Sequence, residues 1–107
     1  MLRAISPEEL QRLLAERPQE LLLLDVREPR ERAVARIEPS LHIPMNQVQG
    51  RIAELPRDRE IVVYCHAGTR SGMVASFLER SGFPKVANLT GGIEDWSLRV
   101  DSSVPRY

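Results

Sequence analysis

Short apolar runs alternate with segments of helical periodicity, and this alternation constrains the fold more than any other feature of the chain. The clearest run, IVVYC at residues 61–65, is short, apolar and rich in β-branched residues. LLLLDV at residues 21–26 is typical of a strand buried on both faces. LHIP at residues 41–44 and KVANL at residues 85–89 predict two further strands. Strands that alternate with helices predict a parallel sheet that helices cover on both faces.

Helix signals lie between these predicted strands. Ser6 is expected to cap a helix that begins at Pro7, with Glu9 completing a capping box. Further helices are expected at residues 29–35, at residues 48–55, between Ser71 and Ser81, and in a short segment that carries a core-packed Trp96.

Length, charge and cysteine content exclude several classes of function. A chain of 107 residues predicts one domain, residues 1–107, in which residues 99–107 form a surface tail. Fifteen basic and fifteen acidic residues give a net charge of zero, so neither a nucleic-acid nor a membrane partner is expected. One cysteine and two histidines provide neither an internal disulfide nor the usual zinc ligands, and no metal or cofactor is expected. The first residues lack the apolar core of a secretory signal, so a cytoplasmic location is expected.

Cys65 stands where the clearest strand meets a loop that contains a glycine. A cysteine at a strand end is often only a small buried apolar residue. Here, however, the segment HAGTRS supplies a flexible Gly68, a positive Arg70 and a helix start in direct succession. Such a turn directs backbone N–H groups and the positive end of a helix inward, which favours a thiolate. The pattern therefore favours a nucleophilic Cys65.

Several motifs together resemble the rhodanese family. CHAGTRS at residues 65–71 resembles its active-site loop, with Cys65 at the catalytic position. Three other stretches resemble its second-strand, third-strand and closing motifs in the same order: LLDVREP at residues 23–29, LHIP at 41–44 and LTGGIEDW at 89–96. The tail VDSSVPRY resembles that of stand-alone rhodaneses and of rhodanese domains fused to sulfur-carrier activating enzymes. The resemblance implies an α/β fold with a central, mostly parallel five-stranded sheet and helices on both faces.

The resemblance also implies a thiosulfate sulfurtransferase mechanism. The Cys65 thiolate attacks the outer sulfur of an anionic donor such as thiosulfate, sulfite leaves, and a thiol or cyanide takes the sulfur from the Cys65 persulfide. Backbone N–H groups would hold the persulfide and Arg70 would attract the donor. The substrate-binding loop expected around Cys65 comprises His66, Ala67, Gly68, Thr69, Arg70 and Ser71.

Single residues of this loop leave alternatives open. His66 is either a proton shuttle or a solvent-facing side chain, and we treat it as a specificity residue. Thr69 either lines the mouth or only shapes the turn. The hydroxyl of Ser71 is expected to bond to the backbone in the first turn of the helix.

Asp25 and Arg27 are predicted at a neighbouring strand end, either as a turn cap with a structural ion pair or as a buttress behind the loop. Where the family commonly carries Gly-His-Ile, this chain has Ala35-Arg36-Ile37, so Arg36 is a candidate for positive charge near the mouth.

Other functions remain as alternatives. Related phosphatases and arsenate reductases use a loop one residue longer than the four residues between Cys65 and Arg70, so this tighter loop favours sulfur. A persulfide relay to a sulfur-acceptor protein, such as a sulfur-carrier or tRNA-thiolation partner, would use the same chemistry. A non-catalytic docking module is disfavoured because Cys65 is present.

Overall fold

The predicted strands form one sheet in a computed structural model that describes residues 2–107. All neighbouring strands are parallel, and their order across the sheet is β1-β5-β4-β2-β3. The strands are β1 (Arg3–Ile5), β2 (Leu21–Asp25), β3 (Leu41–His42), β4 (Glu60–Tyr64) and β5 (Val86–Leu89). The expected five-stranded α/β fold is confirmed, and the sheet is parallel throughout. The residue patterns indicated only four of the strands, because β1 is three residues long and mostly exposed.

The helices follow the predicted alternation with two differences. They are α1 (Pro7–Glu16), α2 (Pro29–Val34), α3 (Thr69–Arg80) and α4 (Gly92–Arg99), and three 3-10 segments are η1 (Pro18–Glu20), η2 (Met45–Gln47) and η3 (Gln49–Glu54). The helix expected at residues 48–55 is instead the 3-10 segment η3, in which Leu55 N–H bonds to the Ile52 carbonyl three residues earlier, and the segment is kinked at Arg51. Helix α3 begins at Thr69, two residues before Ser71. This earlier start brings its first turn into the predicted loop.

Of the capping box predicted at the start of α1, the hydrogen bond to the Ser6 side chain is present, whereas the Glu9 side chain bonds elsewhere. The Ser6 hydroxyl accepts a hydrogen bond from the Glu9 backbone N–H at 3.0 Å, as an N-cap should. The Glu9 carboxylate pairs with Arg3 at 2.6 Å. It therefore ties the start of α1 to β1.

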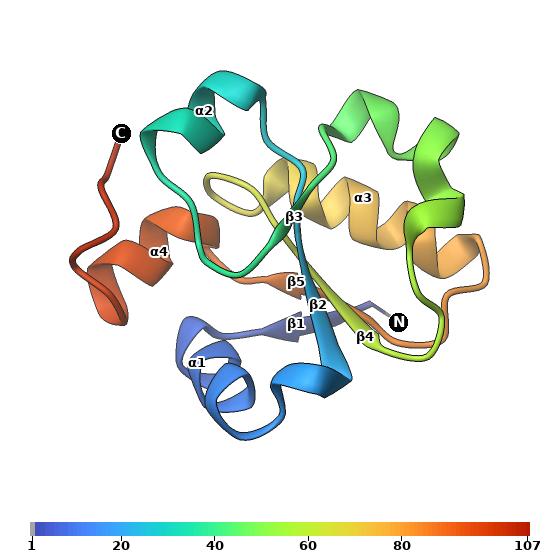
Figure 1. Cartoon of the computed structure of the whole chain (residues 1–107), viewed down its shortest axis with the longest axis horizontal. Coiled ribbons are helices and arrows are strands. Elements are labelled where there is room, and N and C mark those ends of the chain that lie inside the picture. Colours follow the sequence, from blue (N-terminus) through green and yellow to red (C-terminus); the bar gives the residue numbers. More distant parts are fainter. Residues whose placement is uncertain (1) are drawn as a thin grey trace.

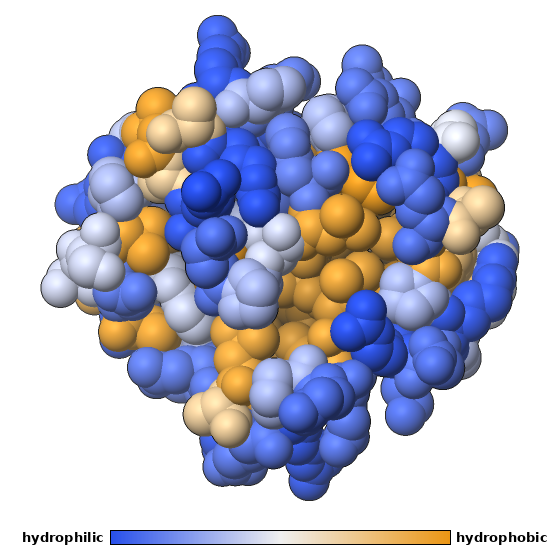
Figure 2. Space-filling view, in the orientation of Figure 1, coloured by the Kyte–Doolittle hydropathy of each residue, from blue (hydrophilic) through white to orange (hydrophobic). Residues whose placement is uncertain are grey.

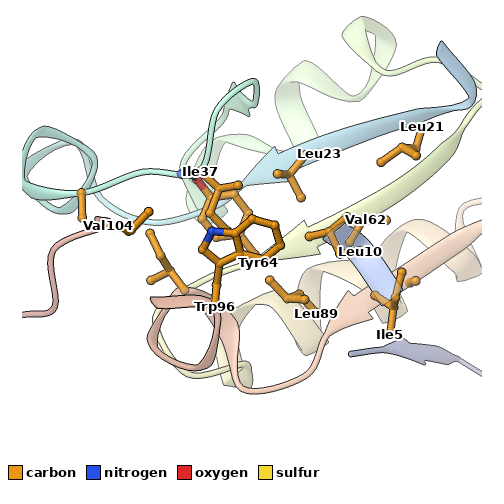
Figure 3. Packing of buried hydrophobic residues seen from close by; sticks show 13 residues of the cluster. Ile5, Leu10, Leu21, Leu23, Ile37, Val62, Tyr64, Leu89, Trp96 and Val104 are labelled. Carbon is orange, nitrogen blue, oxygen red and sulfur yellow. Dashed lines mark hydrogen bonds between the residues drawn. The ribbon is translucent and has the colours of Figure 1, made fainter. Parts of the chain in front are cut away.

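Two apolar clusters cover the two faces of the sheet. In Figure 1, α1 and α4 lie on one side of the sheet, and α3, η2 and η3 lie on the other. Figure 3 shows the first cluster, in which Trp96 of α4 lies beside Tyr64 and Ile37. The second cluster contains Cys65 and Val74, together with other side chains of β4 and α3. Trp96 is thus a core residue, as predicted.

The edge of β2 is only partly covered, because β3 pairs with β2 at Leu24 and Asp25 alone. Beside the earlier part of β2, which does not pair with β3, there is a hollow. It is lined by Leu14, Pro18, Leu21, Leu22, Leu23, Pro39, Ser40, Leu41 and Arg59. Figure 2 shows apolar surface gathered near the middle of this face. The hollow follows the amino-terminal half of β2 and leaves the carboxyl ends of the strands free for the loops described below. None of the helices in residues 2–107 has the length and apolar character needed to cross a membrane.

Candidate active site

The carboxyl ends of β2 and β4 lie side by side and carry the residues singled out in the sequence. Asp25, the last residue of β2, pairs in register with Tyr64, the last residue of β4. The turn containing Arg27 and the loop that starts at Cys65 therefore leave the sheet at the same edge. This is the edge at which parallel sheets bind ligands.

The backbone between β4 and α3 forms a tight turn. Gly68 adopts a left-handed conformation, with φ of 112°, immediately before α3. This conformation disfavours side chains and explains the glycine. From the opposite side, the N–H of Ile93 donates to the Cys65 carbonyl at 2.9 Å and that of Glu94 to the His66 carbonyl at 3.1 Å. The start of α4 therefore holds the loop carbonyl groups.

Gly92 allows this close approach of α4 to the loop. Its φ is 61°, and a Cβ atom at this position would lie 2.6 Å from the Cys65 carbonyl oxygen and would also collide with His66. Gly92 of the closing motif is therefore needed to pack α4 against the loop.

The Cys65 side chain is almost fully buried, and its sulfur lies against the start of α3. The backbone N–H of Gly68 donates to Sγ at 3.1 Å, and the Ser71 hydroxyl lies 3.3 Å from it. Burial would raise the pKa of the Cys65 thiol. Hydrogen bonds from the Ser71 side chain and from the backbone N–H groups of Ser71, Gly68 and Ala67 outweigh that effect and lower the pKa. A free thiol with a lowered pKa at a helix start is suited to act as a nucleophile.

Ser71 contacts side chains, and its expected bond to the backbone was wrong. Its hydroxyl lies 2.6 Å from Oδ1 of Asn88 as well as 3.3 Å from the Cys65 sulfur. Asn88, from β5, also donates from Nδ2 to the Gly68 carbonyl at 3.1 Å. A Cβ atom on Gly72 would lie 3.3 Å from that Nδ2, so a glycine in α3 makes room for the amide. Asn88 therefore holds both sides of the turn around Cys65.

Arg70 forms a two-pronged ion pair with Glu31 of α2. Its Nη1 and Nη2 atoms donate to the two carboxylate oxygens at 2.7 and 2.9 Å. These bonds lower the pKa of Glu31 to about 2 and raise the pKa of Arg70, whose charge also interacts with Cys65. The pair holds the guanidinium beside the loop in a fixed orientation.

Asp25 and Arg27 form the structural ion pair that the sequence predicted as one of two alternatives. Both side chains are fully buried, and Arg27 donates to both Asp25 oxygens at 2.9 and 2.8 Å. Asp25 accepts further bonds from Tyr64 at 3.0 Å and Arg32 at 3.1 Å. Burial raises the pKa of Asp25, but the bonds from Arg27 and Tyr64 outweigh it, so the pKa is lowered. Arg27 also reaches Tyr107 at 2.8 Å, which links the pair to the surroundings of the loop.

The other predicted residues lie at the rim or away from the loop. The His66 ring stacks on the Tyr107 ring at a centroid distance of 4.2 Å. Ala67 and Thr69 are exposed. Arg36 lies 3.6 Å from Glu38 in an exposed pair, so its charge is partly compensated there. Within residues 2–107, no three His, Cys, Asp or Glu side chains are grouped closely enough to hold a metal ion.

Sequence reasoning missed three residues near the loop, namely Glu31, Asn88 and Tyr107. Glu31 lies 39 positions before Arg70, with which it pairs. Tyr107 lies 76 positions after Glu31, to which its hydroxyl donates. Asn88 had one weak signal, since it is a polar residue inside a predicted strand that is otherwise mostly apolar. No local pattern marked the other two, because their partners come from distant segments.

Comparisons with known proteins agree with this geometry. The model of the family described as rhodanese-like domain matches residues 6–99. A protein named sulfurtransferase from Allochromatium vinosum is 38% identical over 97 residues, which cover 91% of this chain and 90% of that protein. A protein named thiosulfate sulfurtransferase from Pseudomonas syringae is 34% identical over 94 residues, 88% of this chain and 86% of that one. A crystal structure of a rhodanese-related protein from Thermoplasma volcanium superposes with a TM-score of 0.80 at 31% identity, covering 92% and 93% of the two chains.

Proposed function

The chain belongs to the rhodanese-like domain family, and on that premise we propose that it is a sulfurtransferase that uses thiosulfate as donor. The carrying observation is the buried Cys65 thiol, which receives hydrogen bonds from the loop and has a lowered pKa. The thiosulfate specificity is supported by the name of the relative from Pseudomonas syringae and by the positive Arg70 beside the loop.

In the proposed first step, the Cys65 thiolate attacks the outer sulfur of thiosulfate. A sulfur–sulfur bond forms at Cys65, the original bond between the two thiosulfate sulfurs breaks, and its electron pair leaves with sulfite. The terminal sulfur of the persulfide takes the negative charge. In the second step, cyanide or a thiolate attacks that terminal sulfur, and the Cys65 thiolate is regenerated. The two steps together are covalent catalysis with ping-pong kinetics.

The residues around the sulfur have separate roles in this proposal. The N–H groups of Ala67, Gly68 and Ser71 face the sulfur and would stabilise negative charge on the persulfide. Arg70 would draw the anionic donor to the mouth and stabilise the leaving sulfite. The four-residue spacing from Cys65 to Arg70 makes a small ring of donors, which favours a single terminal sulfur over a tetrahedral phosphate.

The proposal is tested by the intact mass of the protein after incubation with thiosulfate and removal of the excess reagent. We expect a gain of one sulfur atom, its loss on addition of cyanide, and no gain in Cys65→Ser. No adduct with thiosulfate, mercaptopyruvate or polysulfide would exclude a sulfurtransferase. Hydrolysis of an aryl phosphate that depends on Cys65 would favour a phosphatase instead. Transfer of sulfur from the loaded protein to a partner protein would favour the relay.

A further inference from the structure

The tail expected to be only a surface segment reaches the candidate active site. Val104 is buried, and its carbonyl accepts a bond from the Ser97 hydroxyl of α4 at 2.6 Å. From this anchor the chain continues to Tyr107, and Figure 1 shows the C-terminus beside α2. The Tyr107 ring stacks on His66 at an interplanar angle of 16°. The tail therefore contacts both α2 and the loop.

The tail also contacts two carboxylates, Glu31 and Glu94, that lie beside side chains of the loop. Glu31 pairs with Arg70 and accepts a hydrogen bond from the Tyr107 hydroxyl at 2.9 Å. Glu94 lies 3.7 Å from the His66 ring and pairs with Arg106 at 2.7 Å.

The Tyr107 hydroxyl stands between two ion pairs. It accepts from Nη1 of Arg27 at 2.8 Å and donates to Oε2 of Glu31 at 2.9 Å. Arg27 is fixed by the fully buried Asp25, whereas the Glu31–Arg70 pair is partly open to solvent. The hydroxyl thus connects a rigid buried pair to the pair at the mouth of the site. Burial raises the pKa of Tyr107 to about 12, so the hydroxyl keeps its proton at neutral pH.

We propose that Tyr107 is a positioning residue for Arg70: through Glu31 it fixes the guanidinium, and so determines how well the site binds an anionic sulfur donor. This inference rests on the proposed sulfur transfer for its substrate. Its physical reason is the flexibility of arginine, which loses much rotamer freedom when it is held in one orientation. A Glu31 carboxylate already held by Tyr107 removes part of that cost before the donor arrives.

The first test compares Tyr107→Phe with the natural protein in thiosulfate:cyanide turnover. Phenylalanine keeps the ring that stacks on His66 and removes only the hydroxyl. We expect KM for thiosulfate to rise about threefold, since the lost bond to a charged group is partly exposed and acts at one remove. The kcat value is expected to stay unchanged. Ser102→Ala, in the same tail and exposed, is the matched control and should leave both constants unchanged.

A double-mutant cycle separates positioning from a general structural effect. In an Arg70→Ala background, and equally in Glu31→Ala, adding Tyr107→Phe should leave KM unchanged, because the side chains that transmit the effect are gone. An equal rise of KM in these backgrounds would overturn the inference, as would an unchanged KM in the single variant. Thermal unfolding of each variant shows whether the fold is retained.

A second readout does not depend on sulfur transfer. Cys65 is alkylated with the anion iodoacetate and with neutral iodoacetamide, and the ratio of the two rates reports the positive potential at the mouth. Tyr107→Phe should lower this ratio toward that of Arg70→Ala while the iodoacetamide rate stays constant. An unchanged ratio would overturn the inference. If the natural protein forms no persulfide, the proposed function fails, and the alkylation ratio still decides the role of Tyr107.

Discussion

Replacing Ser71 by alanine should raise the pKa of Cys65 and slow its reactions at acidic pH. The serine has a single hydroxyl hydrogen and two neighbours that can accept it, the Cys65 sulfur at 3.3 Å and Asn88 Oδ1 at 2.6 Å. The Asn88 amide is oriented by its Nδ2 bond to the Gly68 carbonyl, so its oxygen faces Ser71. When Cys65 ionises, we therefore expect the hydroxyl to turn from Asn88 toward the sulfur.

The magnitude is a difference between two hydrogen bonds. A bond to a charged acceptor contributes roughly 1.5–3 kcal/mol and a neutral one roughly 0.5–1.5 kcal/mol. The net stabilisation of the thiolate by Ser71 is therefore about 1 kcal/mol, which corresponds to about a fivefold change in the thiolate fraction below the pKa. The pKa of Cys65 rises when this stabilisation is lost, so the effect appears at acidic pH and disappears once both proteins are fully ionised.

The assay is the rate of Cys65 alkylation by iodoacetamide across the range from acidic to alkaline pH. Ser71→Ala should react about fivefold more slowly on the acidic side and equally fast at the alkaline plateau. Asn88→Ala should shift the profile in the opposite direction, because it releases the hydroxyl to the sulfur. The double variant should resemble Ser71→Ala. A profile for Ser71→Ala that is unchanged, or that shifts to lower pH, would refute this reasoning.

Three further changes test the surroundings of the site. Asp25→Ala should lower the free energy of unfolding by about 3–5 kcal/mol in denaturant titrations, because it leaves the fully buried Arg27 charge unpaired; a loss below about 1 kcal/mol, typical of an exposed pair, would contradict this. Glu31→Gln should lower the free energy of unfolding at neutral pH. The difference from the natural protein should shrink as pH falls from about 4.5 toward about 2, because the stabilisation given by the ionised Glu31 is lost as this carboxylate is protonated; a difference that grows with acid would contradict the lowered pKa of Glu31. Gly92→Ala should lower the melting temperature and the Cys65 alkylation rate, whereas Gly50→Ala, whose Cβ would meet nothing within 4 Å, should change neither; equal effects would show that close packing of α4 is unimportant.

The alternation of strands and helices was predictable because it depends on local chemistry. The run at residues 61–65 is apolar and rich in β-branched residues, and its first four residues lie in the central strand β4, with Cys65 directly after the strand end. The Ser6 cap was predicted for the same reason, since the unpaired N–H groups of a first helical turn favour an acceptor side chain at the residue just before the helix. The errors arose where local signals are weak. β1 has three residues and gains its stability from pairing with β5, and the segment at residues 48–55 has apolar residues at helical spacing but adopts 3-10 geometry.

The sequence alone determined the strand–loop–helix turn, its single cysteine and the four-residue spacing to Arg70, because these are properties of adjacent residues. Only the tertiary structure decided which side chains meet that turn. Asn88 comes from β5, Glu31 from α2 and Tyr107 from the tail, and each reaches the site through packing between distant segments. Such contacts depend on the relative positions of whole elements, which no local pattern encodes. The candidate nucleophile could therefore be singled out from the sequence, whereas the side chains that contact Cys65 and Arg70 required the fold.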